Sequence, residues 1–150
     1  MVALPFCLMI FAILEVGLVF VTDSILENAT IETGRLIRTG RAAGEGLTSK
    51  ETFKAGVCSR MSFLESGCDA RMDVDVRVIQ QFAPVTDPLK NGRFDPSQTS
   101  YTNGLPGNLV LVRVWYRQPL VTGFMTQGLH RQKDGTARLT ATTTFRNEPQ

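Results

Sequence analysis

Residues 1–22 read MVALPFCLMIFAILEVGLVFVT, and this stretch decides the fold. It contains one charged side chain, Glu15, whereas every lysine and arginine of the chain lies after it. A helix of this length rises about 33 Å, and the hydrocarbon core of a bilayer is about 30 Å thick. The stretch therefore predicts a transmembrane helix.

Two other structures for this stretch fit the sequence less well. A cleaved secretory signal would have a basic beginning, a shorter apolar core and a small-x-small cleavage site, and residues 1–22 end instead in Val19-Phe20-Val21-Thr22. A buried core helix would have polar residues at every third or fourth position. We therefore expect membrane insertion.

The helix is predicted to continue beyond the apolar stretch as an amphipathic helix. Gly40 and the Gly44-Glu45-Gly46 cluster supply flexible residues at which it would end. We expect an N-terminal helix within residues 1–43, with a transmembrane part at 1–22 and an amphipathic extension at 23–41. Its apolar and small residues recur at steps of three and four: Ile25, Leu26, Ala29, Thr33, Leu36, Ile37 and Gly40.

Residues 44–150 are predicted to form a soluble α+β domain. Thr48 and Glu51 have the spacing of a capping box, in which each side chain bonds a backbone N–H at the start of a helix. We expect that helix at about residues 49–65. Its buried face would carry apolar residues at helical spacing: Phe53, Val57, Met61 and Leu64.

Three later segments predict strands. Met72–Ile79 alternates between apolar and charged residues, which is typical of a strand with one wet face. Leu109–Tyr116 is apolar at nearly every position and should be covered on both faces. Arg138–Phe145 is rich in threonine, which suits a half-exposed sheet. Together they predict a small antiparallel sheet.

Two long connections join these strands. The segment Ala83–Gly107 contains four prolines and two Asn-Gly pairs, so we expect a loop, and loops of this length are often functional. The segment Pro119–Gly135 contains several apolar residues and is expected to pack against the domain.

Composition excludes several classes of function. The chain has 150 residues, 16 of them basic and 14 acidic, and this small positive excess gives no case for binding nucleic acid. Its one histidine, His130, lies in a polar stretch, and its three cysteines lack zinc-site spacing. Asp87, Asn91 and Asp95 lack the spacing of a calcium loop. No nucleophile elbow, phosphate loop or dinucleotide fingerprint occurs. We therefore expect no catalytic residues, no metal and no cofactor.

A membrane helix with an amphipathic extension, a short helix and a small antiparallel sheet, in this order, is similar to the architecture of type IV pilins and pseudopilins. The sequence itself resembles the TadE-like family of tight-adherence pilus assembly proteins. The resemblance lies in FAILEVGLVF at 11–20, ILENA at 25–29, GRLIRTG at 34–40, NLVLVRVWYRQPL at 108–120 and TATTTFRNEP at 140–149. Fold class is accordingly expected to be α+β and pilin-like.

The resemblance implies a structural function. The chain would be a minor pilin or pseudopilin of a tight-adherence (Flp-type, type IVb) pilus, anchored in the inner membrane and supporting pilus biogenesis, adhesion and biofilm formation. Its partners would be other pilin-like subunits, the inner-membrane assembly machinery and the lipid bilayer. The alternative is a membrane-anchored periplasmic enzyme or ligand-binding domain, with its site under the loop at Ala83–Gly107.

Processing and topology depend on what precedes Met1. In the family pattern a basic leader, a glycine and a glutamate precede the apolar stretch; Pro5 matches the family's proline, and the glycine and glutamate have no counterpart. Either the chain begins upstream or the processing site is lost, and prepilin peptidase is a partner only in the first case. Arg35, Arg38 and Arg41 alone would place the domain in the cytoplasm. A basic leader would reverse this, and the resemblance implies a periplasmic domain.

Glu15 is the sharpest single feature of the apolar stretch. A carboxylate near the middle of a bilayer costs on the order of 3 kcal/mol and usually finds a partner. We expect Glu15 to pair with a donor on a neighbouring pilin-like subunit or with an amine terminus; the alternative is a protonated or snorkelling side chain. Ala12 and Gly17 are small residues at which a neighbouring helix could pack closely.

Cys58 and Cys68 lie where many members of the family carry two cysteines. In an oxidising periplasm they would form a structural disulfide, and in the cytoplasm they would be two free buried thiols. Cys7 lies in the apolar stretch, where we expect it to act as a small hydrophobic residue.

Overall fold

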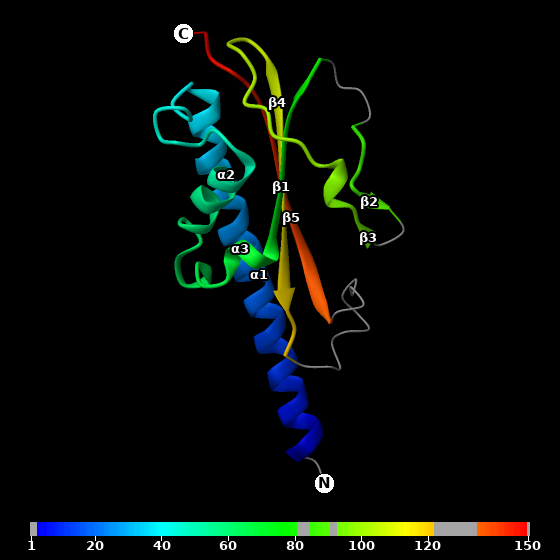
Figure 1. The fold of residues 1–150 in the computed structure, drawn as a ribbon. Helices are drawn as coiled ribbons and strands as arrows, with labels where there is room; N and C mark the ends of the chain where they lie inside the picture. Colours follow the sequence, from blue (N-terminus) through cyan, green and yellow to red (C-terminus); the bar gives the residue numbers. More distant parts are fainter. Residues whose placement is uncertain (1–2, 81–84, 91–92, 122–134, 150) are drawn as a thin grey trace.

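A computed structural model describes residues 3–80, 85–90, 93–121 and 135–149. A single helix, α1 (Ala3–Arg38), runs the length of the molecule, with its N-terminal part projecting beyond the rest of the chain (Figure 1). It ends close to the predicted place because Gly40 adopts a left-handed conformation with φ of 71°. The N–H of Ala42 then bonds the carbonyl of Leu36 at 3.0 Å, which closes the helix end.

The C-terminal half of α1 buries a face that includes three threonines. Thr22, Thr30 and Thr33 are all buried, and each hydroxyl donates to the backbone carbonyl four residues earlier. These bonds satisfy the hydroxyls inside the helix itself. The threonines can therefore face the sheet without leaving unpaired polar groups.

The second helix is shorter than predicted and begins one residue later. Helix α2 (Lys50–Cys58) is capped by Ser49, whose side chain and that of Thr52 form the capping box, so the prediction of Thr48 and Glu51 was wrong by one position. Two short turns follow, η1 (Ser62–Leu64) and α3 (Cys68–Arg71).

The sheet has three antiparallel strands in the order β1-β4-β5. They are β1 (Met72–Ile79), β4 (Leu109–Pro119) and β5 (Thr136–Arg146). The alternation of Met72–Ile79 predicted β1 with its observed bounds, whereas β4 and β5 extend beyond the predicted Leu109–Tyr116 and Arg138–Phe145.

The helices cover one face of this sheet (Figure 1). β1 and β4 each turn alternate side chains toward them, and these fill the core together with apolar residues of α1 and α2. The largest fully buried members are Tyr116, Phe53, Leu26, Met61, Met72, Val57, Val74, Val76, Val110, Val112 and Val114.

The opposite face of the sheet carries the segment predicted as a loop. It contains two short paired strands, β2 (Leu89–Lys90) and β3 (Arg93–Phe94), and a turn, η2 (Pro96–Gln98). The ring of Phe94 lies 5.1 Å from that of Trp115 on β4, measured between centroids. The outer face of β4 is therefore covered, as the sequence predicted for that strand.

Glycines set how closely the elements approach. A Cβ placed on Gly34 of α1 would lie 3.1 Å from Cε1 of Phe145 on β5, and one on Gly56 of α2 would lie 3.0 Å from Cδ2 of Leu47.

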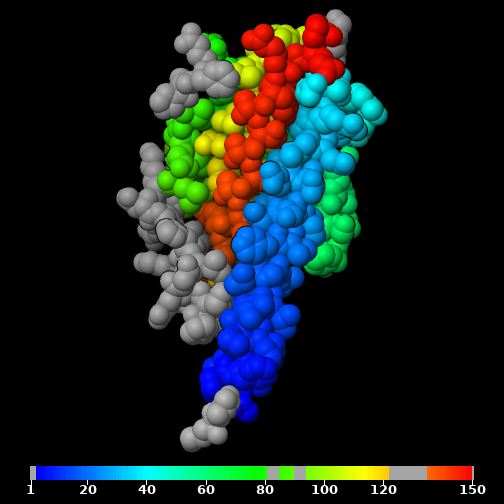
Figure 2. All heavy atoms as spheres, turned by 180° about the vertical axis from the view of Figure 1, so that it is seen from behind, coloured from blue at the N-terminus to red at the C-terminus, as the bar shows by residue number. Residues whose placement is uncertain are grey.

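α1 and β5 lie side by side (Figure 2), and Arg38 at the end of α1 pairs with Glu148 after β5 at 2.9 Å. The predicted α+β class is confirmed.

Candidate functional site

The N-terminal part of α1 presents apolar side chains on all sides. Its residues from Ala3 to Leu14 are exposed apart from Ala12, which is half-buried. Large apolar side chains on all faces of a helix are stable only against lipid or other protein. Within the part of the chain that the structure describes, α1 is the one helix long and apolar enough to cross a membrane.

Glu15 lies where this projecting part meets the sheet domain. Its side chain is turned inward, the residue is 7% exposed, and its Oε1 accepts a hydrogen bond from the backbone N–H of Val121. Val121 follows the end of β4, so the carboxylate links the helix to the sheet. The structure thus gives Glu15 a partner within its own chain, and pairing with a neighbouring subunit stays a prediction.

Ala12 and Gly17 lie on either side of Glu15. Gly17 is exposed, and a Cβ added to it would meet nothing within 4 Å. The space beside it is open to another helix, as close packing at small residues requires. Whether a neighbouring subunit fills that space stays a prediction.

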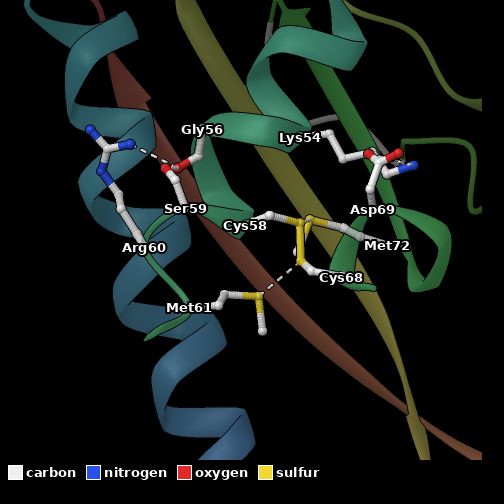
Figure 3. The surroundings of a disulfide bond; sticks show 9 residues. All are labelled: Lys54, Gly56, Cys58, Ser59, Arg60, Met61, Cys68, Asp69 and Met72. Atoms are coloured by element: carbon white, nitrogen blue, oxygen red, sulfur yellow. Dashed lines mark hydrogen bonds and ion pairs between the residues drawn. A yellow bond between two sulfur atoms is a disulfide. The ribbon is translucent and has the colours of Figure 1, made fainter. Parts of the chain in front are cut away.

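Cys58 and Cys68 form a disulfide. Cys58 at the end of α2 and Cys68 at the start of α3 have Cα atoms 5.7 Å apart (Figure 3). The pair is buried, with Sγ of Cys68 3.5 Å from Sδ of Met61 and Sγ of Cys58 4.0 Å from Sδ of Met72. The bond ties α2 to the segment that leads into β1. Cys7 is an exposed free thiol on α1.

An ionic cluster that sequence reasoning missed lies on the outer face of the sheet. Asp75 on β1 is fully buried and lies opposite Arg113 on β4, whose Nη2 is 2.8 Å from its Oδ2. Arg77 forms a second ion pair with Asp75, and the N–H of Ser100 donates to Oδ1 at 2.8 Å. The available signal was an acidic residue on the predicted wet face of one strand and an arginine within the otherwise apolar second strand.

The arginines of this cluster bind the segment that contains β2, β3 and η2, which we call the outer layer. Arg113 also donates to the carbonyl of Thr86 at 2.9 Å, and Arg77 donates to that of Gln98 at 2.7 Å. Burial acts to raise the pKa of Asp75, but the hydrogen bonds from Arg77, Ser100 and Arg113 outweigh it and hold the pKa below its usual value. The cluster therefore attaches the long connection to the outer face of the sheet.

Two carboxylates in the described part of that connection have local structural roles. Asp87 accepts the N–H of Leu89 at 2.9 Å and Asp95 accepts the N–H of Ser97 at 3.0 Å, so both carboxylates stabilise turns. No group of potential metal ligands occurs among the described residues. Asn91 and His130 lie outside these residues.

A cavity of about 160 Å³ lies between the end of α1 and the last residues of this connection. It is bordered by Ile37, Arg38, Asn103, Gly104, Pro106 and Asn147, among others. This volume is below the range typical of small-molecule sites, whereas grooves of about 440 and 420 Å³ lie elsewhere on the described surface. Nothing in the described residues favours the enzyme or ligand-binding alternative.

The segment that contains the exposed apolar helix and the buried Glu15 matches a known family model. Residues 1–35 match the family model of TadE-like proteins. The matched segment is nearly all of α1, and the resemblance to the TadE-like family is confirmed there. The match indicates involvement in the assembly of tight-adherence (Tad) pili. No curated protein and no solved structure matches the chain.

Proposed function

We propose that this chain is a non-enzymatic minor pilin or pseudopilin of a tight-adherence (Flp-type, type IVb) pilus. The observation that carries the proposal is the division of α1 into two parts. The part before Glu15 is apolar and exposed, whereas the part after Thr22 packs on the chain's own sheet. A helix built this way can anchor a folded domain and still offer a free surface to sister subunits.

The proposed location is the inner membrane, with a single span and the sheet domain in the periplasm. The disulfide between Cys58 and Cys68 supports this orientation, because disulfides persist in the bacterial periplasm and are rare in the cytoplasm. If an upstream leader exists, prepilin peptidase would process it. Adhesion and biofilm formation would then depend on the protein through the pilus.

The proposed partners are other pilin-like subunits and the inner-membrane assembly machinery. Helices in lipid associate through close packing at small residues, and Gly17 has open space beside it. Ala12, five residues earlier, is another small residue of this stretch. Glu15 would set the polar contact at the same level of the helix, in addition to its bond to Val121.

Site-specific photocrosslinking in the native host tests the proposal. A photoreactive residue at Gly17 should give adducts with pilin-like subunits, identified by mass spectrometry. The matched control is the same residue at Phe63, which is also exposed and lies in the sheet domain. Deletion of the chain should abolish pili at the cell surface. Normal pili in the deletion strain, or adducts at Phe63 but never at Gly17, would contradict the proposal.

A further inference from the structure

Part of the sheet domain lies beside the apolar part of α1. Val121, after β4, bonds Glu15, and the first residues of β5 lie beside the same turns of α1. We call Pro119–Val121 and Thr136–Thr140 the sheet foot. Between α1 and the sheet foot lies a groove of about 420 Å³, lined by Val16, Val19, Phe20, Leu139 and Thr140 together with the charged residues Asp23 and Arg138.

The sheet foot reaches deep along the helix. Asp23 is the first charged residue after Glu15, so it marks the polar boundary of the apolar stretch. Asp23 lies eight positions after Glu15, a rise of about 12 Å along the helix. The headgroup layer on one side of a bilayer is only about 5–7 Å thick. A helix inserted to Asp23 would therefore carry the sheet foot through the headgroups.

We propose that the sheet foot is a second membrane-contact surface, which rests among the headgroups and upper acyl chains of the bilayer that α1 spans. The occupant of this surface is phospholipid. The proposal rests on the membrane anchoring in the proposed function and adds to it a fixed depth for the folded domain.

The polarity of the sheet foot and its surroundings suits this place. Val121, beside Glu15, is 87% exposed, and Phe20, five residues further along α1 toward Asp23, is 68% exposed. Both apolar side chains would gain from transfer into lipid. The N–H of Val121, which lipid could not satisfy, is bonded by Glu15. An apolar tip with its backbone donor paired can enter a bilayer.

Basic residues follow directly above this tip. Arg117 and Arg138 are paired neighbours across β4 and β5, on the outer face of the sheet. Arg117 lies four residues before Val121, at most about 13 Å along the strand, which brings it near the level of Asp23. Arg117 donates to the carbonyl of Ala70 at 2.6 Å, and the guanidinium of Arg138 lies 4.9 Å from the ring centroid of Phe94. Their positive charges at that level still favour nearby phosphates of phospholipids.

Fluorescence quenching in vesicles tests the proposal with the full chain. Cys7→Ser removes the free thiol, and a single cysteine at Val121, Phe20 or Leu105 then carries an environment-sensitive fluorophore. Leu105 is the matched control, because it is an exposed aliphatic residue, 73% exposed, beside Asn147 at the other end of the sheet. The vesicles contain phosphatidylethanolamine and phosphatidylglycerol, with a lipid spin label near the headgroup.

We expect the spin label to quench the probes at Val121 and Phe20 about twofold or more strongly than the probe at Leu105, since only those lie within its reach. Aqueous iodide should quench the Leu105 probe best. If the lipid spin label quenches the Phe20 probe but quenches the Val121 probe no more than the Leu105 probe, the proposal is overturned, whereas the membrane anchoring by α1 is retained. If none is quenched by lipid, the membrane anchoring of the proposed function fails as well.

Discussion

Asp75 shows how one buried charge organises a whole layer of this molecule. Its carboxylate is fully buried between Arg77 and Arg113, and those two side chains continue to carbonyls of the long connection. A charge buried without such partners would cost several kcal/mol. Removing the carboxylate would therefore leave two partly buried arginines without their shared counterion.

Asp75→Asn should lower the free energy of unfolding by about 3 kcal/mol at neutral pH. Because the folded pKa of Asp75 lies below its unfolded value, its contribution is present above the unfolded pKa and is lost as the pH falls through the folded pKa. Urea titrations in detergent at several acidic pH values measure both effects. Asp73→Asn, in the same strand and on the same face, is the control. Equal acid sensitivity of wild type and D75N would contradict the prediction.

Gly34→Leu should destabilise the fold, because the new side chain would meet Phe145 where even a Cβ lies at 3.1 Å. The cost of such overpacking is about 1–3 kcal/mol. Gly17→Leu is the matched control, since it gains the same helix propensity where nothing lies within 4 Å. Thermal melts followed by circular dichroism compare the two. The prediction fails if G34L melts no lower than G17L.

At the scale of the element, the disulfide holds α2 against the start of β1. Replacing Cys58 and Cys68 together by alanine should lower the free energy of unfolding by about 3 kcal/mol, because the open chain gains conformational entropy when unfolded. Denaturant titrations with and without reductant measure the loss. Cys7→Ser, which touches no disulfide, should leave stability unchanged in both conditions. A reductant effect in the double variant would point to another cause.

The sequence predicted an element well where one local rule governed it. Met72–Val78 alternates between apolar and charged residues, and β1 forms there because one face meets the core and the other meets the segment of β2 and β3. The helix predicted at 49–65 ends at Cys58, although its periodicity continues. Ser62 there adopts a positive φ of 53°, and the disulfide at Cys68 redirects the chain, which are tertiary effects.

The outer layer and the ionic cluster could not be predicted as readily. Asn91-Gly92 between two short segments is a hairpin signal, and the flanking β2 and β3 do pair. The prolines around them favoured a loop instead. Asp75 and Arg113 are 38 residues apart, and their contact follows from a strand register that the sequence alone did not supply.

Glu15 was singled out from its sequence, but its partner was not. A carboxylate in an apolar stretch predicts a polar contact wherever it lies. The donor is a backbone N–H at Val121, and a backbone group leaves no trace in the sequence. Val121 reaches Glu15 because β4 extends to Pro119, beside the apolar part of α1.

At the scale of the whole molecule, the folded domain should be stable without the exposed part of α1. A chain that lacks residues 1–14 should keep its melting temperature within a few degrees, because that part buries little against the sheet. It should lose membrane association, which carbonate extraction measures. A chain lacking residues 1–25 should unfold, since it also loses buried Thr22 and Glu15. The prediction is wrong if both truncations unfold alike.

The side-by-side course of α1 and β5 also determines how the molecule bears load. The helix and the strand run in the same direction, and Arg38 meets Glu148 where both end. If α1 is anchored as proposed and the C-terminal end of β5 is held, a pull on the N-terminal end of α1 along its axis would load the helix–strand contact in shear. Tension transmitted through a pilus would therefore meet a domain whose geometry resists mechanical unravelling.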